Sequence, residues 1–354
     1  MMKPARMSLI LFLVIATISS LPALAQEPTT VTLVAHDSFN VSEGVFEKFQ
    51  SETGITVEIL RVGDAGSLVN QSILSRGNPL GDVLFGVDNT FLGRALDGDI
   101  FVPYESPLLA DIPDEFKLDP EFRVTPIDYG DVALNYDVAY FEANELPLPE
   151  SLADLTKPEY RGLLVVQNPT ISSPGLAFLL TTIDQFGTEG DYTYLDFWQD
   201  LIANDVYISD DWTDAYYTQF SGSAGSQGTR PLVVSYASSP PAEVYFADPQ
   251  PQTAPTGTIV SDGTAFRQIE FAGILRGTQN ETAAQQLIDF MLSVSFQEDV
   301  PLQMFVFPVN PEAALPDVFV EFARIPENPV VLNIDEINQN REAWLQAWTE
   351  TVLR

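Results

Sequence analysis

Residues 55–89 read ITVEILRVGDAGSLVNQSILSRGNPLGDVLFGVDN, and this stretch decides the fold. Residues 55–62 alternate apolar and polar side chains as a strand does, residues 68–74 follow helical spacing, and residues 82–87 are apolar enough for a buried strand. A further β-rich run at residues 31–35 precedes them. Strands that alternate with helices at this pace predict βαβ units around a parallel sheet, and therefore an α/β fold.

A second alternation of the same kind occupies the later part of the chain. The expected strands are residues 163–167, 231–236 and 266–272, and the expected helices are residues 174–186, 192–202, 283–292 and 334–353. A Pro-rich acidic connection, roughly residues 103–126, separates this part from the first, and a Pro-rich loop is expected at 247–257.

Two α/β regions in one chain predict two lobes. The chain is expected to cross between them near residues 127–136 and to return near residues 264–272. The first lobe then combines residues 26–130 with residues 268–354, and the second lobe comprises residues 131–267. Ligands on such sheets bind at the carboxyl ends of the strands, so the residues that follow the early strands are candidates for a site: 36–38, 63–66 and 88–89.

The charge of the chain limits its partners. It carries 16 Lys and Arg against 50 Asp and Glu, a formal net charge of −34. Binding of nucleic acid or of an anionic lipid surface needs clustered basic residues, so both are excluded as partners. The absence of Cys from the sequence excludes disulfides, thiol nucleophiles and Cys-ligated metals. A neutral or cationic partner is expected.

Residues 1–25 have the pattern of a secretory signal peptide. Lys3 and Arg6 precede an apolar run, residues 9–18, and Ala23-Leu-Ala25 fits the cleavage site. The apolar run is much shorter than the roughly 20 residues that a membrane span needs. We therefore expect cleavage near Ala25 and an exported, soluble protein of the periplasm or the extracellular face.

Two segments place small hydroxyl residues at the start of a helix. Ser172 and Ser173 precede Pro174 between a strand and a helix, and Ser239 precedes Pro240 in a similar layout. The free N–H groups of a helix start can bind an anionic or polar ligand group. Plain capping of the helix, without a ligand, is the alternative.

Trp212 and Asp64 are the other candidates for binding. Trp212 lies in an acidic segment, residues 210–216, where an indole can serve as a platform for a cation, although it can equally be a half-buried surface residue. Asp64 lies between Gly63 and Gly66, where its carboxylate can bind an amino-bearing or cationic ligand or can satisfy a turn.

Signals for catalysis are weak. His36 is the single histidine, so any Ser-His-Asp triad would have to use it, and no H-E-x-x-H or Asp-rich calcium loop occurs in the sequence. A secreted hydrolase that works with a pair of carboxylates stays open, because 50 acidic residues supply many pairs.

Several short segments occur in a characteristic order along the chain. They are His36-Asp-Ser-Phe39, Gly63-Asp-Ala-Gly66, Asp128-Tyr-Gly130, Asn168 to Leu176, Asp211-Trp212, Ser235-Tyr-Ala-Ser-Ser-Pro240, Gln268-Ile-Glu270, Phe307-Pro-Val309 and Arg341 to Trp348. Together they resemble the thiamine-binding periplasmic proteins of ABC importers, within a larger family of iron, polyamine and thiamine substrate-binding proteins.

The resemblance implies a bilobal periplasmic-binding-protein type II fold, with two parallel-type sheets, flanking helices, a two-strand hinge and the ligand between the lobes. Carried over by position, the ligand contacts fall on Asp64, Ala65, Ser172, Ser173, Trp212, Tyr236, Ala237, Ser238, Ser239 and Pro240. Additional contacts are expected from His36, Asp37, Tyr245 and Phe305.

The chain departs from the family at three of these positions. Family members have a Tyr where His36 stands, and Phe305 takes the place of a Trp. A Tyr expected soon after Pro240 is missing, although Tyr245 lies one helical turn onward.

The implied function is that of a transport receptor without enzymatic activity. It would capture thiamine or a thiamine phosphate and deliver it to an ABC permease, acting as a monomer, with no cofactor and no metal. Trp212 and Tyr236 would stack on the cation, and Asp64 would oppose its charge. Ferric iron, suggested by the adjacent Tyr216 and Tyr217, and a polyamine are the alternative ligands.

Overall fold

The computed structural model describes residues 29–354, so the predicted signal peptide lies outside the described residues. The strands are β1 (Thr30–Ala35), β2 (Thr56–Arg61), β3 (Val83–Asp88), β4 (Phe101–Val102), β5 (Thr125–Asp137), β6 (Leu164–Gln167), β7 (Tyr207–Ser209), β8 (Leu232–Tyr236), β9 (Thr256–Ile259), β10 (Phe266–Leu275) and β11 (Phe307–Pro308). The α-helices are α1 (Glu43–Thr53), α2 (Ala65–Leu74), α3 (Leu92–Asp97), α4 (Val138–Ala143), α5 (Ser173–Phe186), α6 (Tyr194–Ala203), α7 (Ser239–Tyr245), α8 (Glu281–Leu292), α9 (Val294–Gln297), α10 (Val300–Met304), α11 (Asp317–Phe322) and α12 (Ile334–Val352). The predicted α/β class is confirmed.

The strands form one hydrogen-bonded sheet, in the order β2-β1-β3-β10-β5-β8-β6-β7. The strands β1, β2 and β3 are parallel, as are β6, β7 and β8. Two parallel-type sheets are expected from the sequence, whereas the structure has two parallel sets of strands within one continuous sheet. Between them lie β5 and β10, which run antiparallel to each other and join the sets into one path.

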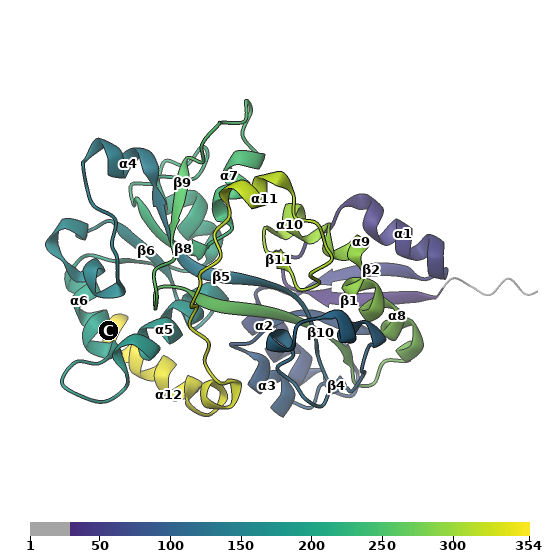
Figure 1. Cartoon of the computed structure of the whole chain (residues 1–354). Helices are drawn as coiled ribbons and strands as arrows, with labels where there is room; N and C mark the ends of the chain where they lie inside the picture. Colours follow the sequence, from purple (N-terminus) through teal and green to yellow (C-terminus); the bar gives the residue numbers. More distant parts are fainter. Residues whose placement is uncertain (1–28) are drawn as a thin grey trace, which may run out of the picture.

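The strands β5 and β10 are the elements that connect the two sides of the molecule (Figure 1). The first part of β5 pairs with β10 from Thr125 to Val132, and its last part pairs with β8 and β9 up to Asp137. Both strands run through the places where the lobe boundaries are predicted, near residues 130 and 267. Those boundaries stay a prediction.

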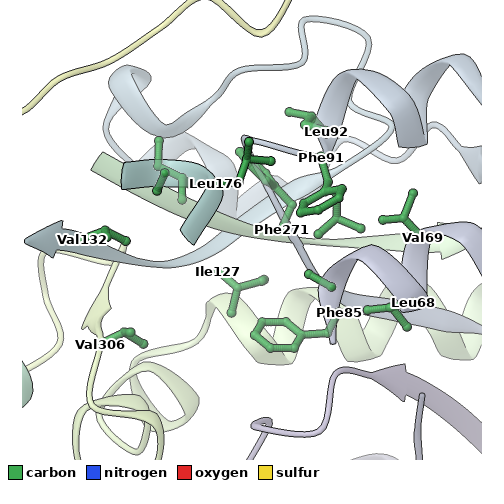
Figure 2. Packing of buried hydrophobic residues seen from close by; sticks show 14 of the residues in the cluster. Leu68, Val69, Phe85, Phe91, Leu92, Ile127, Val132, Leu176, Phe271 and Val306 are labelled. Atoms are coloured by element: carbon green, nitrogen blue, oxygen red, sulfur yellow. The ribbon is translucent and has the colours of Figure 1, made fainter. Parts of the chain in front are cut away.

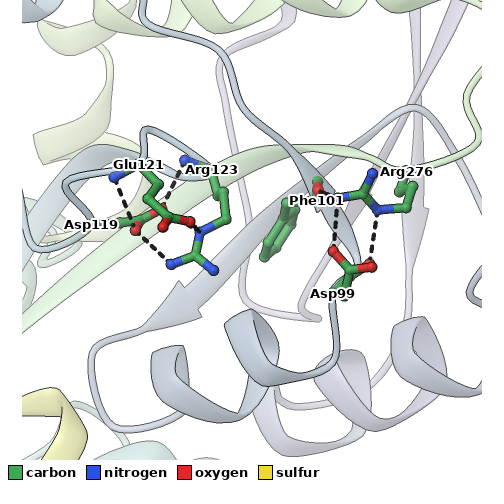
Figure 3. Close-up of polar contacts among 6 residues, drawn as sticks. All are labelled: Asp99, Phe101, Asp119, Glu121, Arg123 and Arg276. Carbon is green, nitrogen blue, oxygen red and sulfur yellow. Dashed lines mark hydrogen bonds and ion pairs between the residues drawn. The ribbon is translucent and has the colours of Figure 1, made fainter.

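Arginine side chains fix the outer ends of both crossing strands (Figure 3). Arg123, just before β5, binds the buried carboxylate of Asp119 through Nη2 at 2.8 Å and Nε at 3.1 Å. Arg276, just after β10, donates to Asp99 Oδ1 and to the carbonyl of Phe101, both at 2.7 Å. Paired guanidinium groups of this kind hold a fixed geometry, so the outer ends of β5 and β10 are anchored.

The C-terminal helix α12 packs against helices from both ends of the sheet. Its contacts are with α3, which follows β3, and with α6, which precedes β7. Trp344 and Trp348 share its buried face, as their spacing predicts, and the ring of Trp348 meets that of Trp198 edge to face with centroids 5.4 Å apart. The helix therefore ties the two ends of the sheet together on one surface.

The hydrophobic core surrounds the crossing strands (Figure 2). Ile127 of β5 and Phe271 of β10 are buried among Phe85 of β3, Leu68 of α2 and Leu176 of α5. Full burial of such side chains contributes about 1.5–3 kcal/mol each to the free energy of unfolding.

The connecting segments differ from the prediction in two places. Short 3₁₀ turns at 107–116 interrupt the Pro-rich connection, and β9 begins at residue 256, inside the expected loop. Among residues 29–354, no helix is long and apolar enough to cross a membrane.

Candidate ligand-binding cleft

A cleft of about 630 Å³ lies where β5 and β10 meet both halves of the sheet. Volumes of this size are typical of sites for small molecules. Ten of the predicted contacts line it: His36, Asp37, Asp64, Ala65, Ser172, Ser173, Trp212, Tyr236, Ser239 and Phe305. The structure thus brings together residues that are far apart in the sequence.

Four predicted contacts do not line the cleft. Ala237, Ser238 and Pro240 are buried, and Ser238 Oγ donates to the carbonyl of Phe305 at 2.5 Å, so these residues hold the start of α7. The ring of Tyr245 packs beside Phe246, which lines the cleft together with Ala242. Residues 242 and 246 are one helical turn apart and line the cleft together, whereas the side chain of Tyr245 is exposed to solvent outside it.

Trp212 forms part of an aromatic wall. Its ring stacks on Tyr216 with centroids 5.0 Å apart and an interplanar angle of 14°. The indole Nε1 donates to Ser235 Oγ at 3.0 Å, and this bond fixes the orientation of the ring. The neighbouring Asp211 lines the cleft, whereas Asp214 accepts from Ser209 Oγ at 2.6 Å and so has a structural role.

Asp64 combines the two roles that its sequence allows. It is the N-cap of α2, and its carboxylate accepts from the N–H of Ala65 at 2.7 Å. The same residue lines the cleft. Burial raises the pKa of the Asp64 carboxyl above its ordinary value, so its charge is costly until a donor or a cation approaches.

The start of α5 already holds a carboxylate. Ser173 Oγ donates to Asp88 Oδ2 at 2.5 Å, and the other oxygen of Asp88 accepts from the N–H and hydroxyl of Thr90. Burial raises the pKa of Asp88 to about 6, against the opposing effect of these hydrogen bonds. Within the described part of the chain, the buried hydroxyl of Ser172 at the same helix start has no hydrogen-bond partner.

The floor of the cleft contains residues that sequence reasoning did not place in the site. Gln268 and Glu270 of β10 line the cleft, and Gln268 Oε1 accepts from the hydroxyl of Tyr236 at 3.1 Å. Residues 268 and 270 share one face of the strand, so the alternation of polar and apolar residues was the pattern in the sequence that could have indicated their place in the site. An alternating polar face on a strand usually faces solvent, which is why the pattern alone did not identify them.

Two glycines make room for the side chains of this floor. A Cβ at Gly86, where φ is +97°, would lie 2.1 Å from Cδ2 of His36. A Cβ at Gly130 would lie 3.0 Å from the ring of Tyr236. The close approach of the Tyr236 ring from β8 therefore explains the glycine at position 130, in the segment Asp128-Tyr-Gly130.

Comparisons with known proteins agree with this arrangement. A model of the family described as bacterial extracellular solute-binding protein matches residues 78–340. The thiamine-binding periplasmic protein of Salmonella typhimurium is 26% identical over 348 residues, covering 97% of this chain and 99% of that protein.

Two solved structures show the same fold. A periplasmic thiamin binding protein superposes with a TM-score of 0.77 at 23% identity, covering 92% of this chain and 96% of that one. Iron-bound HitA from Pseudomonas aeruginosa superposes with a TM-score of 0.73 at 20% identity, covering 92% of this chain and 99% of that one. The predicted periplasmic-binding-protein type II fold is confirmed by these superpositions.

Proposed function

The chain belongs to the bacterial extracellular solute-binding proteins, and on that premise we propose that its cleft captures thiamine for delivery to an ABC permease. The family is one of binding proteins, which agrees with the prediction of a receptor without enzymatic activity. The full-length similarity to a thiamine-binding relative supports the choice of ligand.

The observation that carries the proposal is the pairing of an aromatic wall with carboxylates in one cleft. Thiamine joins an aminopyrimidine to a cationic thiazolium ring. The stacked pair of Trp212 and Tyr216 offers a flat face to such a ring, and a cation over an aromatic face gains about 0.5–2 kcal/mol. Asp64 lines the same cleft and can accept from an amino group or oppose the positive charge.

The start of α5 favours free thiamine over its phosphates. A phosphate at this helix start would meet the carboxylate of Asp88, which is bound to Ser173. Neighbouring like charges oppose each other strongly in a buried site. The unpartnered hydroxyl of Ser172 suits the neutral hydroxyl end of thiamine instead.

The alternative ligands fit the cleft less well. Ferric iron would need phenolate oxygens, yet burial raises the pKa of Tyr216 and Tyr236 well above the ordinary value for tyrosine. A polyamine is a flexible chain without a ring, so it would leave the flat face of Trp212 unused. A hydrolase is disfavoured by the family of the chain, which is described as one of solute-binding proteins.

Delivery to a permease requires export, so the proposal includes removal of the predicted signal peptide near Ala25. The mature receptor is proposed to act as a monomer, with thiamine as its ligand and with no cofactor. The acidity of the chain agrees with a cationic ligand, because a net charge of −34 for the full sequence, which loses only the positive Lys3 and Arg6 with the signal peptide, attracts cations over long distances.

The experiment is a titration of the mature protein with thiamine, with thiamine monophosphate, spermidine and ferric citrate as comparison ligands. We expect saturable binding of thiamine in the submicromolar range, and weaker binding of the monophosphate. Trp212→Ala and Asp64→Ala should each weaken the binding of thiamine, whereas Tyr207→Ala, a substitution of a tyrosine outside the cleft, should not. Saturation by iron or spermidine alone would contradict the proposal.

A further inference from the structure

Glu270 is a cleft-lining carboxylate that lies between a buried acid, Asp128, and the single histidine of the chain, His36. It lies on β10, one of the two crossing strands, and faces Asp128 of β5 directly across the strand pair. Its side chain is 14% exposed, so it is largely buried but still reaches the cleft.

Asp128 cannot carry a second charge at this place without a large cost. The residue is fully buried, and in the described chain neither of its carboxyl oxygens receives a hydrogen bond from a donor. Burial, followed by the charge of Glu270, raises the pKa of Asp128 well above its ordinary value. The proton of the pair therefore resides on Asp128, and Glu270 carries the charge that faces the cleft.

His36 neutralises that charge from the other side. Its Nε2 lies 3.3 Å from Glu270 Oε1, and its side chain is 12% exposed. Burial alone would lower the pKa of His36, but the charge of Glu270, with smaller contributions from Asp64 and Asp88, raises it above 6.5. The imidazolium is thus the cationic partner of Glu270 at the cleft.

Other titratable groups surround this ion pair. Those on the elements packed around it are Asp64 at the start of α2, Asp88 at the end of β3, Asp128 of β5 and Tyr236 of β8, and Asp37 and Asp211 also line the cleft. All are acids, so His36 is the one basic side chain in the set. Among these described groups, His36 is therefore the one whose positive charge a ligand cation meets in the cleft.

We propose that Glu270 determines specificity for a cationic ligand, and that the ligand replaces the imidazolium of His36 as its partner. The exchange is balanced in charge: one ligand cation enters, and one proton leaves Nε2 of His36 for the solvent. This inference rests on the proposed function, because thiamine supplies the cation. It predicts that thiamine binds more tightly as the pH rises through the range in which His36 loses its proton.

The test is calorimetry of the mature chain with thiamine at about pH 6 and about pH 8, in two buffers of different ionisation enthalpy. At the lower pH we expect net release of protons on binding, and at the higher pH a smaller release with a lower Kd. Glu270→Gln should weaken thiamine binding by about tenfold or more. Glu47→Gln, which removes the same charge from the exposed face of α1, should change neither quantity.

His36→Gln provides a second test, the number of protons released on binding, which does not depend on whether Glu270→Gln folds. This variant should release fewer protons than the wild type at about pH 6. The inference is overturned if thiamine binds Glu270→Gln as tightly as the wild type, or if proton release is the same in His36→Gln. A wild type that does not bind thiamine would instead contradict the proposed function.

Discussion

Trp212 is the residue whose optical signal should report on the ligand. Of the four tryptophans of the chain, Trp198 and Trp348 are fully buried, Trp344 is 8% exposed, and Trp212 alone lines the cleft. Fluorescence therefore reports on the cleft through this ring. Its stacking on Tyr216 and its hydrogen bond to Ser235 hold it ready for a planar ligand.

Trp212→Phe should abolish most of the fluorescence change that thiamine causes, while retaining part of the affinity. Complete loss of the interaction of a cation with a ring, about 0.5–2 kcal/mol, would weaken binding about 2- to 30-fold, and because a phenyl ring still offers an aromatic face we expect a smaller loss than that. Trp344→Phe is the matched control and should keep the fluorescence change. An unchanged signal in Trp212→Phe would show that the ligand binds elsewhere.

Asp88 should make the ligand-free protein less stable as the pH rises from about 4 to 6. Its folded pKa of about 6 lies above its ordinary value of 3.8, so the folded state holds the proton more tightly than the unfolded state. The stabilisation is present at low pH and is lost as the pH passes the folded pKa, by up to about 3 kcal/mol.

Chemical denaturation at several pH values checks this prediction on the wild type and on Asp88→Asn. The difference in unfolding free energy between the two should change across this window and then level off above about pH 7. A difference that is independent of pH would rule out the assigned protonation of Asp88.

At the scale of elements, α12 depends on one buried ring. Trp348 is fully buried and packs edge to face on Trp198 of α6. Trp348→Ala should lower the unfolding free energy by about 3–5 kcal/mol, because it leaves a cavity between the two helices. Gln346→Ala, on the exposed side of the same helix, should change it by less than about 0.5 kcal/mol. Urea denaturation measures both, and equal effects would contradict the packing described.

The elements differ in how far the sequence could predict them. The strands β1, β3 and β6 were predicted because each is a short apolar run between turn signals, and the face of α12 was predicted from its spacing. The position of Phe246 could not be predicted, because it depends on α7 beginning at Ser239 and so placing residues 242 and 246 on the cleft. The roles of Gln268 and Glu270 depend on β10 crossing beside β5, a long-range pairing that no local pattern contains.

At the scale of the molecule, the net charge of −34 should act on the rate of capture more than on its specificity. The rate constant for association with thiamine should fall as salt rises from about 0.01 to 0.5 M, because the Debye length shrinks from about 30 Å to less than 8 Å. The rate of dissociation, set by contacts inside the cleft, should change much less. Stopped-flow fluorescence separates the two rate constants. An equal dependence of association and dissociation on salt would contradict the assignment of the net charge to the rate of capture.

The central claim is that the cleft beside β5 and β10 binds thiamine in preference to other cations. Native mass spectrometry of the mature chain, incubated with equimolar thiamine, spermidine and ferric citrate, tests it most directly. We predict one thiamine molecule bound per chain, and loss of that species in the double variant Trp212→Ala with Asp64→Ala. A spectrum dominated by an iron or spermidine adduct, or by thiamine bound equally to the double variant, would contradict the claim.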